Sequence, residues 1–173
     1  ERALAIREQA FGPIHPYTAQ ILNNLANYLS TTGDPADRAA ARPLYERTPA
    51  IVEGALGPTH PDTATSLNNL AADLAKSDDP ADRAAARPHL ERTLTIREQA
   101  LGPTHPDTAT SLNNLAGYLS EAGDPADRAA ARPLFERALA IYEERVATDG
   151  WQPVMGVLWS LGNLLETLGE VDA

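Results

Sequence analysis

Histidines that could bind a metal recur at one position of a repeated pattern. His15, His60 and His105 each stand directly before a proline, at intervals of 45 residues. Imidazole is a common zinc ligand, but a zinc site needs three or four ligands that converge on the ion. The sequence offers none of these histidines a second ligand at short spacing. We therefore interpret each imidazole as the cap of a helix that begins at the following proline, and we expect no metal and no cofactor.

Paired aspartates are the second set of residues that could do chemistry. Asp34 and Asp37 recur at positions 79 and 82 and again at 124 and 127, and two neighbouring carboxylates can act as general acid and general base. They stand in the sequence Asp-Pro-Ala-Asp, however, which supplies an N-cap, a proline for the first helical position and an acidic residue for the positive helix end. Capping accounts for them. The sequence holds no glycine-rich phosphate loop, nucleophile elbow or Cys–His pair, so we expect no catalytic residues and no enzymatic activity.

Carboxamide side chains are the third set, and they favour binding over catalysis. An amide has both donors and an acceptor, so a row of asparagines can pair with the N–H and the C=O of an extended peptide. The candidates for such a groove are Gln20, Asn23, Asn24, Asn27 and Ser30 in the first repeat, Thr65, Asn68, Asn69, Ala72 and Lys76 in the second, and Thr110, Asn113, Asn114 and Gly117 in the third. Trp159, which we align with Asn23, Asn68 and Asn113, is a candidate aromatic anchor. Two alternatives stay open: the asparagines tie helices together or are inherited by duplication, and Trp159 packs against another helix or another subunit.

A 45-residue repeat must position these side chains. The stretch Gly-Pro-Thr-His-Pro-Asp-Thr-Ala-Thr-Ser-Leu-Asn-Asn-Leu-Ala is identical at 57–71 and 102–116 and has a drifted copy at 12–26. The stretch Asp-Pro-Ala-Asp-Arg-Ala-Ala-Ala-Arg-Pro recurs unchanged on the same period. Such self-similarity predicts a stack in which each unit buries its apolar face against its neighbours. We expect an all-α, right-handed solenoid of antiparallel helical hairpins, divided as follows: a partial second helix at 1–12, repeats at 13–57, 58–102 and 103–148, and the first helix of a further repeat at 149–173.

The apolar pattern predicts where the helices lie. Leu22, Leu25, Ala26 and Leu29 form an i, i+3, i+4, i+7 stripe, so the first helix of the first repeat runs over about 16–31, and the next two repeats copy it. Leu158, Leu161, Gly162 and Leu165 form the matching stripe in the last segment. The second helices begin at the Asp-Pro sequences and run to Leu56 and Leu101.

Prolines inside the predicted second helices conflict with a regular helical hydrogen-bond pattern. Pro43, Pro88 and Pro133 each remove a helical hydrogen bond, at about 3 kcal/mol, so we expect a kink or a loosened first turn before each of them. Pro49 lies deeper in the helix, and we expect that helix to be the most distorted.

The two helix patterns together resemble a known family. Leu22-x-x-Leu25-Ala26-x-x-Leu29 in a first helix and Ala131-x-x-x-Phe135-x-x-Ala138 in a second are similar to tetratricopeptide repeats. The longer motif through Gly-Pro-x-His-Pro-Asp-Thr resembles the kinesin-light-chain type, which is found widely in bacterial proteins. The resemblance implies a scaffold for protein partners. The usual unit of this type is shorter, with the excess here in Asp-Pro-Ala-Asp-Arg-Ala-Ala-Ala, and the basic residues that some members use to hold acidic peptides are mostly absent.

Composition limits the partners. The formal net charge is −10, from 24 acidic and 14 basic residues, which argues against nucleic acid. The repeated Arg38, Arg42 and Arg47 lie beside acids, and we expect them on solvated or ion-paired surface. There are no cysteines, and no apolar run approaches the roughly 20 residues of a membrane span. Abundant alanine and arginine suggest a GC-rich bacterial source. The opening Glu1-Arg-Ala-Leu-Ala-Ile matches the interior of a later repeat, so we take the start as a cut end and expect a cytoplasmic location.

Three functions are consistent with these patterns. The first is a non-enzymatic scaffold that binds an extended peptide in a groove lined by the amides. The second is a self-associating structural module of a larger protein, suggested by the helices without an outer partner at both ends and by Trp151 and Trp159. The third is a sensor segment of a bacterial signalling protein.

Overall fold

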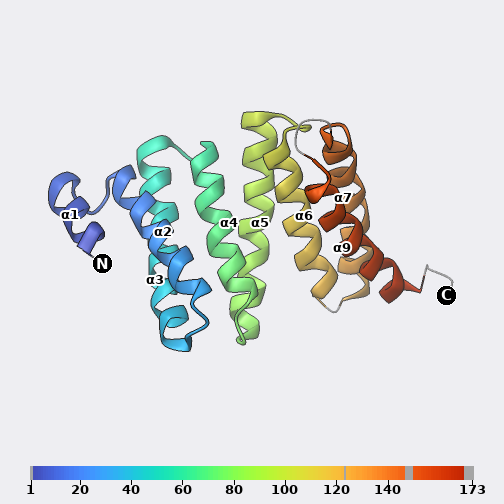
Figure 1. The fold of residues 1–173 in the computed structure, drawn as a ribbon, viewed down its shortest axis with the longest axis horizontal. Coiled ribbons are helices and arrows are strands. Elements are labelled where there is room, and N and C mark those ends of the chain that lie inside the picture. The colour runs from blue at the N-terminus through green and yellow to red at the C-terminus, as the bar shows by residue number, and fades with distance from the viewer. Residues whose placement is uncertain (1, 123, 147–149, 170–173) are drawn as a thin grey trace. The chain divides into compact units, whose positions relative to one another are not determined.

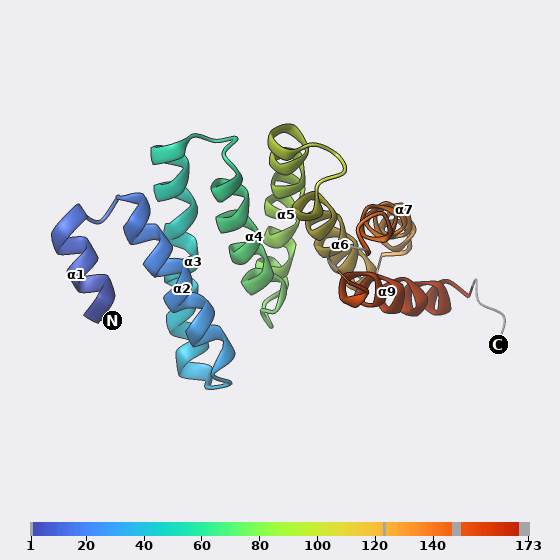
Figure 2. The ribbon, with the colours of Figure 1, turned by 45° about the horizontal axis from the view of Figure 1, so that its top comes forward.

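The protein is all-α, as predicted. The computed structural model describes residues 2–122, 124–146 and 150–169, which form eight helices packed as consecutive antiparallel hairpins (Figures 1 and 2). The helices are α1 (Arg2–Phe11), α2 (Pro16–Thr31), α3 (Pro35–Leu56), α4 (Pro61–Ala75), α5 (Pro80–Leu101), α6 (Pro106–Glu121), α7 (Pro125–Glu143) and α9 (Gln152–Leu168). The helix limits predicted from the apolar stripes and the Asp-Pro sequences are therefore confirmed.

The chain divides into two compact units, Glu1–Ile96 and Arg97–Ala173, and the division falls inside α5. In the first unit α2 packs on α1 and α3, and α3 also packs on α4. In the second unit α7 packs on both α6 and α9. Each of these second helices, α3 and α7, therefore contacts the first helix of its own repeat and that of the next, which is the packing of a stacked repeat.

Histidine and aspartate side chains cap the N-termini of the helices. They are the residues considered above as possible metal ligands and as possible catalytic acids and bases. The Nδ1 atoms of His15, His60 and His105 accept hydrogen bonds from the backbone N–H groups two residues later, at 3.2, 3.1 and 3.1 Å. Asp34 and Asp79 accept from the backbone N–H groups of the second residue after them, each at 2.8 Å. Both capping predictions are confirmed.

The turn before each first helix is held by a glycine and a threonine. Gly57 has φ +98°, a conformation that costs side-chain-bearing residues strain, and its carbonyl accepts a hydrogen bond from Thr63 Oγ1 at 2.9 Å. The same bond joins Thr18 to Gly12 and Thr108 to Gly102, at 2.8 Å each. The threonines are fully buried, so this bond fixes the helix start relative to the preceding chain.

The helices run without a break through their internal prolines. Pro43 lacks the N–H that would have bonded the carbonyl of Ala39, but Ala39 is exposed, so water can satisfy that carbonyl. Pro49, in contrast, is buried. The predicted kinks stay predictions.

The apolar face predicted for the last helix is wrong in register. Leu158 was expected inside but is 42% exposed, and α9 instead buries Val154, Val157 and Leu164. These three lie 45 residues after Ala109, Leu112 and Leu119, which are buried in α6. The 45-residue period therefore continues into α9 without an extra residue, and Trp159 corresponds to Asn114, not to Asn113. The remaining members of the expected stripe, Leu161, Gly162 and Leu165, are half-buried. The sequence also predicts turns at Gly123-Asp124 and over 148–153. Of these turn residues, Gly123, Thr148 and Asp149 lie outside the described residues.

The N-caps give a direct stability test. Replacing Asp79 with alanine removes the capping acceptor of α5 and should lower the free energy of unfolding by about 1 kcal/mol. Urea unfolding followed by circular dichroism measures the change. The neighbouring Asp78 does not cap α5 with its side chain, so Asp78→Ala should have little effect; equal losses for both variants would contradict the capping role.

Candidate functional site

Two pockets open between the helices of the first unit, and together we call them the α2–α4 groove. The Val52 pocket has a volume of about 310 Å³ and the Lys76 pocket about 240 Å³. The Val52 pocket is lined by Pro16, Tyr17, Ala19, Gln20, Asn23 and Asn24 of α2, Thr48, Val52 and Leu56 of α3, and Asp62, Thr65 and Ser66 of α4. The Lys76 pocket is lined by Asn27, Ser30, Arg38, Tyr45, Asn69, Ala72, Asp73 and Lys76.

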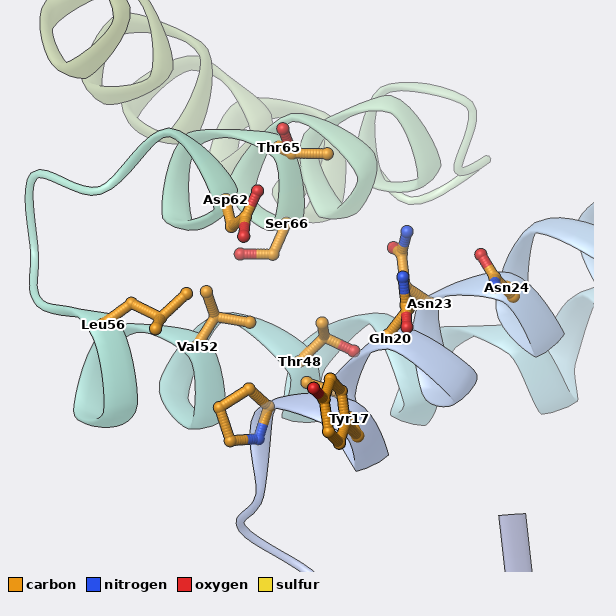
Figure 3. A pocket seen from close by; sticks show the side chains of 12 residues that line it. Tyr17, Gln20, Asn23, Asn24, Thr48, Val52, Leu56, Asp62, Thr65 and Ser66 are labelled. Carbon is orange, nitrogen blue, oxygen red and sulfur yellow. The ribbon is translucent and has the colours of Figure 1, made fainter. Parts of the chain in front are cut away.

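The Val52 pocket has an apolar wall opposite a polar one. Figure 3 shows Val52 and Leu56 on α3 across from Asp62 and Ser66 on α4. Ser66 Oγ already donates to the Thr63 carbonyl at 2.8 Å, so its remaining capacity is as an acceptor. The pocket can therefore take an apolar side chain against α3 while polar groups of a ligand meet α4.

An amide bridge stands between the two pockets. Asn69 Nδ2 donates to Asn23 Oδ1 at 2.8 Å; Asn23 lines the Val52 pocket and Asn69 lines the Lys76 pocket. One alternative left open by the sequence, that asparagines tie helices together, thus holds for this pair. Each residue uses only half of its amide in the bridge. Asn23 Nδ2 and Asn69 Oδ1 have no protein partner among the described residues, which leaves one donor and one acceptor side by side.

A tyrosine from the second helix orients another amide. Tyr45 OH donates to Asn27 Oδ1 at 2.7 Å and lies 3.2 Å from Ser30 Oγ. Burial raises the pKa of Tyr45, with the Ser30 hydrogen bond opposing and the Asp73 charge adding to the rise, so the phenol stays protonated and donates. The carbonyl of the Asn27 amide is therefore occupied, and its NH₂ group is left for another acceptor.

Arg42 joins three helices beside the Lys76 pocket. Its guanidinium on α3 bonds Asp73 of α4 through Nε and Asp82 of α5 through Nη1, the latter at 2.9 Å. Burial lowers the pKa of Arg42, but its hydrogen bonds to the two carboxylates outweigh this, and the pKa is raised overall. The ion pairing expected of the repeated arginines is thus present at Arg42. The Asp73 side chain in this pair is only 7% exposed.

The structure brings together nine of the predicted groove residues in the first unit; Ser30 and Ala72, which line the Lys76 pocket, are two of them. Gln20, Asn23, Asn24 and Thr65 line the Val52 pocket, and Asn27, Asn69 and Lys76 line the Lys76 pocket. Asn68 is half-buried and lines neither of these two pockets.

The candidates of the second unit lie elsewhere. Thr110 Oγ1 is 3.0 Å from Tyr142 OH, and Asn113 Oδ1 is a buried oxygen without a hydrogen-bond partner among the described residues. Asn114 is half-buried, and Trp159 is 74% exposed.

Sequence reasoning missed the contribution of α3, above all Val52. The other repeats place Arg97 and Tyr142 at the position of Val52. In the second unit Arg97, 7% exposed, donates to the Asp107 carbonyl at 2.9 Å and to Ser111 Oγ at 3.0 Å. Asp107 and Ser111 are the counterparts of Asp62 and Ser66, so a short valine leaves open the space that an arginine would fill. Comparing the copies residue by residue could have given this signal.

Comparison with known proteins defines the class. Two family models described as tetratricopeptide repeat match residues 18–62 and 81–144, together more than half of the chain. The chain is a tetratricopeptide repeat protein. Such repeats are generally protein–protein interaction modules and are typically non-catalytic, and no enzyme family is among the matches. A search of curated proteins found no match.

Solved structures show the same fold. A crystal structure described as a kinesin light chain of Podosopora anserina with nearly identical TPR-like repeats has a TM-score of 0.74, and a variant of that protein with a glutamine changed to methionine has 0.75. Both are 22% identical in sequence, and each match covers 98% of this chain and 75% of the other. Both are fungal, so the bacterial source stays a prediction.

Membrane-spanning helices and metal-binding clusters are the next two features, considered for the described residues alone. None of their helices combines the length and the apolar character needed to cross a bilayer. They also contain no group of three or more His, Cys, Asp and Glu side chains placed to hold a metal ion.

The amide bridge can be measured by a double-mutant cycle. Asn23→Ala and Asn69→Ala each break the bond and should lower the free energy of unfolding by about 1 kcal/mol, with little further loss in the double variant. Urea unfolding gives the coupling energy. Asn24→Ala removes a neighbouring exposed amide of the same helix and is the control. Additive losses from the two single changes would show that the bridge is not formed in solution.

Proposed function

We propose that this protein is a non-enzymatic interaction module that binds an extended peptide segment of a protein partner in the α2–α4 groove. The observation that carries the proposal is the half-used amide bridge between two open pockets. A peptide lying along α2 and α4 meets a donor at Asn23 Nδ2 and an acceptor at Asn69 Oδ1, the two groups that its own backbone requires.

The pockets on either side supply places for side chains. Successive side chains of an extended chain point to opposite sides, so alternate residues reach the groove while the others face solvent. An apolar side chain fits against Val52 and Leu56, where burial of its surface contributes about 25 cal/mol per Å². With two pockets and few charges we expect an affinity of roughly micromolar, about −8 kcal/mol.

Self-association is the second candidate, and one observation favours it. Trp151, Met155, Leu158 and Trp159 are exposed at an i, i+4, i+7, i+8 spacing that places them along one side of α9. A second copy that covers this side would remove two tryptophans from water. The sensor segment, the bacterial source and the cytoplasmic location remain predictions.

Filling the Val52 pocket tests peptide binding. Val52→Arg should let the new guanidinium reach the Asp62 carbonyl and Ser66, as Arg97 reaches the equivalent groups, and so close the pocket in a fold that already tolerates arginine there. Peptides selected on the wild-type protein from a random displayed library should lose at least about tenfold in affinity, or about 1.4 kcal/mol, measured by fluorescence anisotropy.

The matched control is Val52→Ile, which keeps an apolar wall and should retain binding. Circular dichroism should show equal helix content for both variants. Undiminished binding to Val52→Arg, or a library that yields no binder of the wild-type protein, would contradict peptide binding in this groove.

Self-association is tested by light scattering at increasing protein concentration. If α9 is an interface, the wild-type mass should rise with concentration and Trp159→Glu, which introduces a charge into the exposed apolar side, should remain monomeric. The control Glu46→Gln alters an exposed residue of α3 and should behave as the wild type. A wild-type monomer throughout the range argues against this candidate.

A further inference from the structure

Arg97 shows how this repeat holds a guanidinium. The side chain is buried, and its Nη1 donates to the backbone carbonyl of Asp107 at 2.9 Å and to Ser111 Oγ at 3.0 Å. These bonds join α5, the second helix of one repeat, to α6, the first helix of the next. Burying a charged group is costly unless hydrogen bonds satisfy it. The two oxygens on α6 are the groups that satisfy Arg97.

The Val52 pocket has the same acceptors but lacks the arginine. Val52 stands 45 residues before Arg97, and it lines the pocket from α3. Asp62 and Ser66, which line the pocket from α4, stand 45 residues before Asp107 and Ser111. The Asp62 carbonyl and Ser66 Oγ are therefore the counterparts of the two groups that accept hydrogen bonds from Arg97.

The α4 wall of the pocket offers acceptors and a negative charge. Ser66 is only 4% exposed, and because its hydrogen goes to the Thr63 carbonyl, its oxygen can only accept from a ligand. Figure 3 shows the side-chain oxygens of Ser66 and Asp62 close together on α4. Among the twelve described residues that line the pocket, Asp62 is the one carboxylate, and none is lysine or arginine.

His60 does not cancel the charge of Asp62. Its Nδ1 lies 3.8 Å from Asp62 Oδ2, but the same Nδ1 accepts the capping hydrogen bond from the Asp62 N–H at 3.1 Å. A ring nitrogen that accepts a hydrogen bond carries no proton, so His60 is neutral while it caps α4. In a chain of formal net charge −10, this carboxylate beside a pocket favours a cationic occupant.

The opposite wall fits the aliphatic part of a long cationic side chain. Val52 and Leu56 lie on α3 across from the polar groups of α4 (Figure 3). Arginine packs its methylene stem on apolar surface and donates from a planar head with five N–H groups. Tyr17 lines the pocket from α2 and offers this head an aromatic ring to stack on.

We propose that the Val52 pocket binds the guanidinium of an arginine side chain in the peptide that occupies the α2–α4 groove. The peptide arginine takes the place that Arg97 fills in the second unit. Its stem packs on Val52 and Leu56. Its head donates to the Asp62 carbonyl and to Ser66 Oγ, and it pairs with the Asp62 carboxylate. The inference rests on the proposed function and narrows the apolar side chain expected at this pocket to the stem of an arginine.

The test uses a random peptide library displayed on phage. Peptides selected on the wild-type protein should share an arginine at one position. In a synthetic binder, changing this arginine to citrulline keeps the size and removes the charge, and should weaken binding about tenfold, measured by fluorescence anisotropy. Changing it to lysine keeps the charge but not the planar head, and should also weaken binding about tenfold.

Protein variants locate the effect. Asp62→Asn removes the carboxylate and should weaken the arginine peptide about tenfold but the citrulline peptide little. The matched control is Asp107→Asn, the same change at the equivalent position of α6, where Arg97 already fills the space. This control should bind both peptides as the wild type does. Affinity for the arginine peptide, but not for its citrulline form, should fall as salt is raised.

The outcomes separate the two proposals. If selected peptides lose binding to Val52→Arg but share no arginine, or if the arginine and citrulline peptides bind equally, the guanidinium site is wrong and the groove stands. Equal binding of the lysine peptide would overturn the assignment to a guanidinium. An equal loss of the two peptides on Asp62→Asn, or an equal loss on Asp62→Asn and Asp107→Asn, would also contradict the site. If the wild-type protein selects no peptide, both proposals are wrong.

Discussion

The hydrogen bond from a buried threonine to a glycine carbonyl is the constraint on which the arrangement of each first helix depends. It fixes where the helix begins, and the 3.6-residue period then decides which residues are buried and which face outward. With Thr18 and Thr63 bonded back to Gly12 and Gly57, the amides of α2 and α4 meet at one place. The last helix lacks this motif. Its N-cap, Trp151, makes no side-chain cap bond, although its buried residues keep the 45-residue spacing of the other copies.

The proposed binding surface of this chain comes from a few substitutions at variable positions of the duplicated repeat. The copies share their caps, turns and buried stripes, so substitutions at other positions change the surface while the helices stay the same. Valine in place of Arg97 or Tyr142 opens a pocket, and lysine in place of threonine or glutamate charges one. A repeated scaffold can thus differ from pair to pair in what it contacts, because each interhelical space is lined by its own few variable positions.

Much of the fold and part of the groove could be predicted from the sequence. The features that were not predicted were missed for identifiable reasons. Helix limits and caps depend on local residues. The same local sequence occurs in three copies, so each limit and cap could be predicted from three examples. Nine of the candidate groove residues line one or the other of the two pockets, because they follow from equivalent faces of the first helices in two repeats. The Asn23–Asn69 bond and the part of Tyr45 depend on distances between helices far apart in sequence, which no local pattern encodes. The register of α9 was missed because the segment before it no longer carries the Gly-Pro-Thr-His-Pro-Asp sequence, so the spacing of apolar residues alone had to place the helix.

The Asn23–Asn69 bridge also limits the shape of anything that crosses it. The two side chains, joined at 2.8 Å, line one pocket each, so a peptide that occupies both pockets as proposed must pass over the bond between them. In that proposed complex we expect the peptide residue nearest to the bridge to be small, such as glycine, alanine or serine, and not branched or aromatic. In the proposed complex, the bridge would limit both the spacing between the two anchoring side chains of the peptide and the size of the residue between them.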